Sequence, residues 1–251
     1  MKIDKVIHSC DNNKFYLDFW PLVSKIWKLK FGIEPILAFI GDEDVDIDDT
    51  YGTVIRMGNI DDVPKYLQAL WVRYWLPVTE PETVWMISDI DMLPISKEYF
   101  VDQIRDIDED KYVHLNPCID TYGTLPSCYH IAKGSKFKEV LELPDSWEKS
   151  LRMVYNSNLG SDPGWHLSGN EHWFADERYA NLKTVKYPKK WDLVFLPRTG
   201  GQNGRRIDRD RWEYQEDLVQ QGWYYDCHSI RPYEQHKQEI DKLVSLIMNE
   251  K

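Results

Sequence analysis

This 251-residue chain has no closely spaced cysteine pair, no long apolar run and few basic residues relative to acidic ones. Its four cysteines are scattered and include no Cys-x-x-Cys pair, so the pattern of a zinc ribbon or a disulfide framework is missing. They are Cys10, Cys118, Cys128 and Cys227. Such spacing favours reduced, mostly packed thiols in a cytosol-like compartment, while a bridge between Cys118 and Cys128 stays an open alternative.

A membrane-spanning run is lacking as well, because no window reaches roughly 18 consecutive apolar residues. Residues 1–10 are polar and lead into a strand pattern, without the apolar region of a signal peptide. We therefore expect no transmembrane segment, and we expect a cytoplasmic protein.

Basic residues are outnumbered, since 31 Lys and Arg stand against 42 Asp and Glu and give a formal net charge of −11. A generic binder of nucleic acid or anionic membranes presents a basic face, and this total argues against one. Disorder is disfavoured too, because 42% of the residues are hydrophobic and 14% are aromatic. We therefore expect a folded protein with no nucleic-acid partner.

Repeats and low-complexity linkers are missing from the sequence, which predicts one continuous domain over residues 1–251. Apolar runs alternate with helical patterns through the first half. This order predicts an α/β fold with a mainly parallel central sheet and helices on both faces. Ligands of such sheets bind beyond the carboxyl ends of the strands.

Hydrophobic periodicity locates the individual strands and helices. Strands are expected at residues 5–8, 35–40, 53–56, 83–87, 112–115, 129–132, 184–187 and 194–196. Helical patterns cover residues 16–27, 65–75 and 240–248. In the first of these, Pro21 should kink or restart the helix, and Gly32 is placed to end it.

The most informative feature is a pair of acidic residues that follows an apolar strand. Asp89 and Asp91 are separated by one residue and come directly after residues 83–87. Two carboxylates at a strand end repel each other without a cation. Hard oxygen ligands of this kind hold Mg²⁺ or Mn²⁺ and leave coordination positions for substrate phosphates. We therefore expect a divalent metal ion at this edge of the sheet.

The segment Ser88-Asp89-Ile90-Asp91-Met92 resembles the Asp-x-Asp motif of the GT-A-fold glycosyltransferases, metal-dependent enzymes that use a nucleotide-sugar donor. The resemblance implies a GT-A-like, Rossmann-type sheet. It also implies a nucleotide- and metal-binding half over about residues 1–95 and an acceptor-binding half, with the C-terminal helix, over about residues 96–251. In that arrangement Asp91 ligates the metal directly, while Asp89 contacts the metal or the ribose.

A late histidine completes the metal shell in members of this fold, and residues 226–232 resemble that segment. The resemblance implies that His228 is a metal ligand and that Arg231 contacts the diphosphate. Asp226 would orient the imidazole ring. The alternative interpretation of His228 is a loop histidine bonded to the backbone.

For the nucleotide, the resemblance implies contacts from the loop after the first strand, where Ser9, Asp11 and Asn12 are the candidates. A helix N-cap is the alternative role, because Asp and Asn are preferred there. Asp42, after the second strand, is the candidate for the base edge, or else a solvated member of an acidic stretch. Arg73 is a candidate for contact with phosphate or with Asp89, although a surface arginine is the favoured interpretation.

The carboxylate for acid–base chemistry is expected within residues 162–174, where Asp162 and Glu171 are the catalytic candidates. Glu171 would lie in the first turn of a helix beginning near Asn170. A Gly-Trp pair upstream resembles the acceptor-side segment of some inverting members, in which a carboxylate deprotonates the acceptor hydroxyl. Glu-His stands here where those members have two acidic residues, so the stereochemistry stays open. A helix-capping carboxylate is the alternative for Glu171.

Tryptophan is abundant, with 11 copies, and it crowds the second half of the chain. The residues concerned are Trp165, Trp173, Trp191, Trp212 and Trp223. A flat indole stacks on a sugar ring while its N–H group finds a polar partner. We expect one or two of these side chains to line an acceptor groove and the others to pack in the core.

Together with the resemblance, these residues predict a glycosyltransferase that moves a sugar from a nucleotide-diphosphate sugar, with UDP favoured, to an acceptor hydroxyl in the presence of Mn²⁺ or Mg²⁺. The charge distribution fits a bound diphosphate. Residues 183–211 carry nine basic and three acidic side chains, whereas residues 42–62 carry one basic and eight acidic ones.

Two other functions stay open. A haloacid-dehalogenase-like phosphatase also places Asp-x-Asp after a parallel strand, although usually near the start of its domain, and Leu93 stands where that family has a hydroxyl residue. A non-catalytic carbohydrate-binding module would account for the tryptophans but leaves the acidic pair unexplained.

Overall fold

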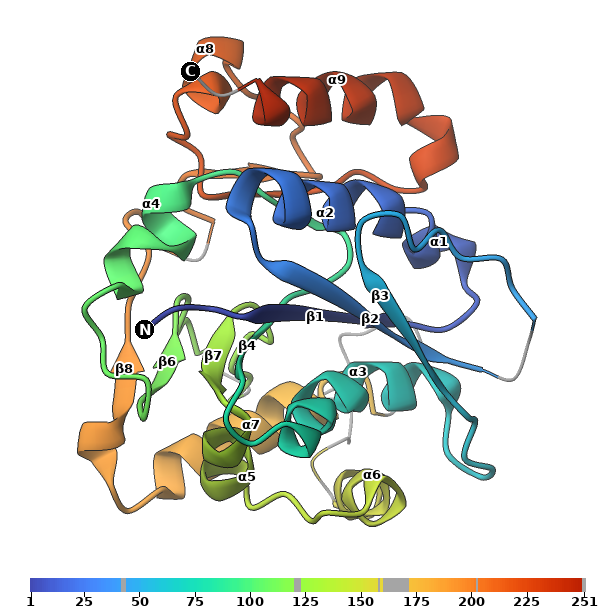
Figure 1. Ribbon diagram of the computed structural model, residues 1–251, viewed down its shortest axis with the longest axis vertical. Coiled ribbons are helices and arrows are strands. Elements are labelled where there is room, and N and C mark those ends of the chain that lie inside the picture. Colours follow the sequence, from blue (N-terminus) through green and yellow to red (C-terminus); the bar gives the residue numbers. More distant parts are fainter. Residues whose placement is uncertain (42–43, 120–122, 158, 160–171, 202, 250–251) are drawn as a thin grey trace.

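A seven-stranded sheet runs through the middle of the molecule in the order β3-β2-β1-β4-β7-β6-β8 (Figure 1). The computed structural model describes residues 1–41, 44–119, 123–157, 159, 172–201 and 203–249. The strands of this sheet are β1 Lys5–Cys10, β2 Glu34–Ile40, β3 Thr53–Met57, β4 Val84–Ile87, β6 Tyr112–His114, β7 His130–Lys133 and β8 Leu193–Phe195.

The pairing of the strands makes this sheet mainly parallel. β1 pairs in parallel with β2 and β4, β2 with β3, and β6 with β8. Only β7 among these strands runs antiparallel to its neighbours, β4 and β6. The expected α/β fold with a mainly parallel sheet is therefore confirmed.

Helices cover both faces of the sheet. They are α1 Lys14–Leu17, α2 Trp20–Ile26, α3 Lys65–Trp75, α4 Lys97–Phe100, α5 Gly134–Leu141, α6 Trp147–Tyr155, α7 Ala175–Lys186, α8 Glu216–Gln220 and α9 Lys237–Met248. Figure 1 shows α2 on one face with α9 stacked outside it, and α3, α5, α6 and α7 on the other face. Because parallel strands need crossover connections, this double cover follows from the strand order.

Two apolar cores lie on either side of the sheet, and β1 contributes to both. Val6 and Ile7 are fully buried neighbours whose side chains enter different cores. Val6 belongs to the core that contains Trp20, and Ile7 belongs to the core that contains Trp71. Successive strand residues point to opposite faces, so a strand covered on both sides reads as a continuous apolar run.

The first helical region behaves as its proline and glycine predict. Helix α2 begins at Trp20 with Pro21 in its first turn, where the missing N–H group is not needed. A π-helical turn, Trp27–Phe31, continues it and ends at Gly32, whose φ of 68° is left-handed. Glycine adopts that conformation without a steric penalty, so the helix stops there.

Two expectations for the second half are wrong. Residues 184–187 do not form a strand, because residues up to Lys186 belong to helix α7. Tyr179, Ala180 and Thr184 are buried at helical spacing, and the Thr184 hydroxyl donates to the Ala180 carbonyl oxygen at 2.9 Å. That contact suits a β-branched residue in a helix. The helix expected near Asn170 begins at Ala175, and Asn170 itself lies outside the described residues.

A small second sheet, which periodicity did not predict, carries residues of the site. Its strands are β5 Met92–Pro94, β9 Arg206–Asp208 and β10 Asp226–His228, in the order β5-β10-β9. His228 lies opposite Met92, and the Ser229 amide donates to the Asp91 carbonyl oxygen at 3.0 Å. The late histidine is thereby fixed beside the acidic motif, although more than a hundred residues separate them.

All four cysteines are free, and the bridge left open between Cys118 and Cys128 is not formed. Cys118 is exposed, whereas Cys128 is buried. Among the described residues, no helix is both long and apolar enough to cross a membrane.

Candidate functional site

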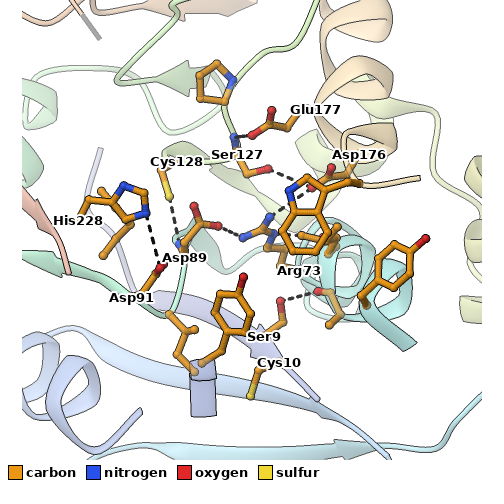
Figure 2. Close-up of a pocket in the computed structure, with 18 of the residues that line it drawn as sticks. Ser9, Cys10, Arg73, Asp89, Asp91, Ser127, Cys128, Asp176, Glu177 and His228 are labelled. Atoms are coloured by element: carbon orange, nitrogen blue, oxygen red, sulfur yellow. Dashed lines mark hydrogen bonds and ion pairs between the residues drawn. The ribbon is translucent and has the colours of Figure 1, made fainter. Parts of the chain in front are cut away.

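A cleft of about 930 Å³ opens where β1 and β4 end and the acidic motif begins. It brings together seven of the residues that the sequence singles out. They are Ser9, Asp11, Arg73, Asp89, Asp91, His228 and Arg231. Figure 2 shows Asp91 and His228 on one side of this cleft, and Arg73 with Asp176 on the other.

Asp91 is nearly buried and is surrounded by positive or protonatable groups. Its Oδ2 atom lies 3.4 Å from an Nη1 atom of both Arg209 and Arg231, and 3.5 Å from Nε2 of His228. Burial opposes the charged form of the carboxyl. His228 and the two arginines outweigh that effect and lower the pKa of Asp91 to about 2. The carboxylate is therefore ionised at neutral pH.

Asp89 faces the opposite way, toward Arg73. The Arg73 guanidinium forms an ion pair with Asp89 and, through Nη2, a second one with Asp176 at 3.2 Å. Only 5% of the Arg73 side chain is exposed, so the favoured interpretation of a surface arginine is wrong and the other candidate role, contact with Asp89, is present. Burial raises the pKa of Asp89, but the charge of Arg73 outweighs it and the net shift is downward.

A carboxyl pair from the start of α7 closes this side of the cleft. Asp176 Oδ2 accepts from the Ser127 hydroxyl at 3.1 Å, and Glu177 Oε1 accepts from the Ser127 amide at 3.1 Å. Burial, then the neighbouring Asp176 charge, raise the pKa of Glu177 to about 8. Burial also raises the pKa of Asp176, against the pull of Arg73. This pair therefore holds a proton near neutral pH.

One oxygen atom of Asp176 is left without a partner. Asp176 is 1% exposed and lines the cleft, yet no donor in the described part of the chain reaches its Oδ1 atom. A buried carboxylate oxygen without a donor costs free energy. A ligand that brought a hydroxyl group to this atom would supply the missing donor.

The turn that carries the motif is fixed from beneath by buried groups. His8 on β1 lies with Nδ1 3.2 Å from the Asp89 carbonyl oxygen, and the Asp89 amide donates to the Cys128 sulfur at 3.1 Å. Burial lowers the pKa of His8 to about 4, so its ring is neutral and donates through Nδ1–H. The backbone between the two aspartates is therefore held in place.

Aromatic side chains line both ends of the cleft. The Arg231 guanidinium stacks over the rings of Phe15 and Tyr16 at 4.9 and 4.8 Å from their centroids. At the other end Tyr66 and Trp173 lie with ring centroids 6.0 Å apart. Trp173 thus lines the cleft, whereas the role of tryptophans in an acceptor groove stays a prediction. Trp191, in contrast, is 72% exposed and is not among the residues that line it.

Asp91 and His228 fit a divalent cation as two ligands. Their Oδ2 and Nε2 atoms are adjacent on the cleft wall, and carboxylate and imidazole both bind Mn²⁺. Within the described ranges, no group of three or more His, Cys, Asp or Glu side chains is gathered closely enough to hold a metal ion. A cation here would complete its shell with water and substrate oxygens, as Mg²⁺ sites in phosphate-handling proteins do.

The remaining sequence candidates have other positions or other partners. Asn12 is exposed and does not line the cleft, whereas Asn13 caps α1 by accepting from the Phe15 amide at 3.0 Å. Ser9 lines the cleft, but it is still part of β1 and its hydroxyl donates to the Ala69 carbonyl oxygen. Asp42, Asp162 and Glu171 lie outside the described residues, as does Trp165.

Asp226 does not orient the ring of His228. It is fully buried and forms ion pairs with Arg198 and Arg206, and it accepts from the Tyr129 hydroxyl at 2.7 Å. Asp208 is the carboxylate on the far side of the His228 ring, with Oδ2 3.9 Å from Nδ1. Asp226 and His228 are two residues apart and therefore share a face of β10, but the partners of Asp226 are Arg198, Arg206 and Tyr129, whereas His228 reaches the cleft.

Sequence reasoning missed Asp176, Glu177 and Arg209. The first two form an acidic pair at the first turn of a helix, which by itself is typical of helix ends. Arg209 was covered only by the general expectation of a basic second-half segment. Their positions in the cleft depend on contacts between distant segments, so no local pattern marks them.

No protein-family model matches the chain, and no curated protein matches it. Among solved structures, the galactosyltransferase LgtC in complex with donor and acceptor sugar analogs is similar with a TM-score of 0.49 and 11% identity, over 97% of this chain and 95% of that one. An active-site mutant of LgtC has a TM-score of 0.46 and 11% identity, over 95% of each chain. At this level of similarity neither structure assigns a function to this chain.

Proposed function

We propose that this protein is a glycosyltransferase that uses a nucleotide-diphosphate sugar and a divalent cation. One observation carries the proposal: a single cleft joins a carboxylate–imidazole pair ringed by arginines to a second, buried carboxylate pair. The first group suits a cation and a diphosphate. The second suits the hydroxyl groups of a sugar and a proton transfer.

At the diphosphate end, Asp91 and His228 would hold Mn²⁺ or Mg²⁺, and Asp89 of the same turn would join them only by leaving Arg73, with which it is paired. The cation would act as a Lewis acid that neutralises the departing diphosphate. Arg209 and Arg231 line the same wall, and guanidinium groups match the geometry of phosphate oxygens. UDP is the favoured nucleotide because of the resemblance to the Asp-x-Asp enzymes.

At the sugar end, Asp176 would accept hydrogen bonds from hydroxyls of the transferred sugar through its unpartnered Oδ1 atom. Glu177 has a pKa of about 8. A general acid or base is most effective when its pKa lies near the working pH. The ionised fraction of the Glu177 carboxyl, the minority form at neutral pH, would take the proton of the acceptor hydroxyl. Asp162 and Glu171 remain candidates for that role. In this scheme residues 1–95 serve mainly nucleotide and metal, and residues 96–251 mainly the acceptor, within one domain.

The phosphatase alternative needs Asp89 as a free nucleophile. In the cleft its carboxylate is paired with Arg73, which disfavours attack on phosphorus. Leu93 is buried in β5, where the phosphatase motif has a hydroxyl side chain. A carbohydrate-binding module would use the Tyr66–Trp173 wall alone and has no need for the arginines around Asp91.

The test is calorimetric binding of UDP with and without Mn²⁺, using Asp91→Asn and the control Asp210→Asn. Asp210 is exposed and does not line the cleft. We expect Mn²⁺-dependent UDP binding by the wild type and the control, and a loss of about tenfold or more in Asp91→Asn. Equal affinity of wild type and Asp91→Asn, or no effect of Mn²⁺, would contradict the proposal.

Hydrolysis of a panel of UDP-sugars by the Mn²⁺-loaded protein would then name the donor, and NMR of the product would show inversion or retention. Phosphate release from simple esters favours the phosphatase. Sugar binding that ignores both metal and nucleotide favours the binding module.

A further inference from the structure

Three side chains converge on one oxygen atom of Asp91. Arg209, Arg231 and His228 each place a nitrogen within 3.5 Å of Oδ2. Only 6% of the Asp91 side chain is exposed, so water cannot replace these contacts freely. The charge of this carboxylate is therefore already compensated by the protein when no ligand is bound.

A divalent cation on the same oxygen conflicts with this arrangement. It would lie within a few ångströms of two guanidinium groups, and like charges at such distances repel strongly in a partly buried site. The conflict disappears when an anion with several oxygens enters, because each guanidinium then finds phosphate oxygens while the cation takes the carboxylate. Metal and anion are thus mutually dependent.

The ligand count points the same way. The described part of the chain gathers no three His, Cys, Asp or Glu side chains suited to a metal ion, so the protein supplies two nearby ligands, Asp91 and His228. Within the described residues, the remaining positions of a six-coordinate cation are left to water and to oxygens of the substrate. A diphosphate would fill them at the moment it draws the arginines away.

We propose that Arg209 and Arg231 couple cation binding to diphosphate binding: they occupy Asp91 in the empty cleft and move to phosphate oxygens when metal and nucleotide enter together. The coupling rests on the proposed function and deepens it. Because of this coupling, the empty cleft binds either the metal or the nucleotide alone weakly, and it binds the two together tightly.

The two arginines differ in how they are held. Arg231 lies over the rings of Phe15 and Tyr16, and these contacts stabilise its guanidinium in its position beside Asp91. The Arg209 side chain is 31% exposed, and among the described residues it forms an ion pair with Asp91. Substitution of Arg209 therefore disturbs little packing, which makes Arg209→Gln the first variant to test, with Arg231→Gln as the second.

The experiment measures Mn²⁺ affinity directly, by the electron paramagnetic resonance signal of free Mn²⁺ on titration of MnCl₂ into the protein, without nucleotide and with saturating UDP. In the wild type, UDP should raise Mn²⁺ affinity about tenfold or more. Without UDP, Arg209→Gln should bind Mn²⁺ at least about threefold more tightly than the wild type does. The factor by which UDP raises Mn²⁺ affinity should fall to less than about a third of its wild-type value. Arg231→Gln should shift both in the same direction.

Arg211→Gln is the matched control, because Arg211 is exposed, lies two residues away and does not line the cleft. It should behave as the wild type. Calorimetry gives an independent check, since Mn²⁺ must raise UDP affinity by the same factor as UDP raises Mn²⁺ affinity.

The outcomes separate this proposal from the proposed function. If the wild type binds UDP only with Mn²⁺ but Arg209→Gln and Arg231→Gln bind Mn²⁺ alone no more tightly than Arg211→Gln, the coupling is wrong and the function stands. If Mn²⁺ has no effect on UDP binding by the wild type, both are wrong.

Discussion

The guanidinium of Arg73 lies 3.2 Å from the carboxylate of Asp176, a residue 103 positions later in the chain. This ion pair ties α3 to the first turn of α7, and both partners are almost fully buried. Since Arg73 also pairs with Asp89, one cation holds a carboxylate of the acidic motif and a carboxylate of the sugar end in a fixed relation. The ion pairs of Arg73 therefore connect the two ends of the cleft.

Loss of Arg73 should be costly. In Arg73→Gln, Asp176 keeps its burial but loses its cation, and removing one partner of a buried pair costs about 3 kcal/mol or more of unfolding free energy. Urea denaturation measures this. Asp176→Asn should cost less in the Arg73→Gln background than in the wild type, because the uncompensated charge is then removed. Independent, additive costs would show that the two residues do not interact.

Arg105→Gln provides the comparison. Arg105 is exposed and pairs with exposed Asp102 three residues earlier in the chain. Solvent-exposed pairs of this kind contribute about 0–1 kcal/mol, so this variant should denature close to the wild type.

Asp176 should matter for turnover more than for the nucleotide. Asp176→Asn removes the charge that faces the sugar end but leaves Asp91, His228 and the two arginines beside Asp91 untouched. We expect UDP affinity in Mn²⁺ to stay within about threefold and the rate of sugar transfer or donor hydrolysis to fall about a hundredfold, as mispositioned substrates do. An unchanged rate would remove Asp176 from the sugar site.

Glu177 should make the protein less stable as the pH rises. Its pKa is about 8 in the folded chain and has an ordinary value of 4.5, so between these values the folded state holds a proton that the unfolded state has released. This contribution to stability is full below pH 4.5 and is lost as the pH rises through 8. Glu177→Gln should therefore flatten the fall in melting temperature between about pH 5 and 8.

Thermal melting of the wild type and of Glu177→Gln at each pH shows whether stability falls as the pH rises. Glu98→Gln is the control, because Glu98 is exposed in the first turn of α4. A pH slope equally steep in all three proteins would place the proton on another group.

Thiol chemistry tests the packing directly. Cys118 is exposed, whereas Cys10, Cys128 and Cys227 are buried, and burial raises the pKa of each of these three thiols. One thiol should react rapidly with Ellman's reagent in the native protein, none in Cys118→Ser, and four in the denatured wild type. Rapid reaction of two or more thiols in the native protein would contradict the described core.

Local pattern was sufficient for much of the fold. Helix α3 has the bounds that the spacing of its apolar residues predicts, and β1, β2, β3 and β4 appear within two residues of their expected limits. The acidic motif was found because it directly follows an apolar strand. Residues 184–187 were misassigned because a short run containing β-branched residues fits a strand as well as a helix.

The sequence by itself therefore determined two things: the helices and strands with strong periodicity, and the position of the acidic pair at the end of β4. Both can be recognised from residues only a few positions apart in the chain. The tertiary structure decided which other groups meet them. Asp176 reaches Arg73, and Arg209 reaches Asp91, only because α7 and the strand pair β9–β10 pack against the end of the main sheet. Such contacts join segments about a hundred residues apart, and their burial sets the charges and pKa values of the cleft.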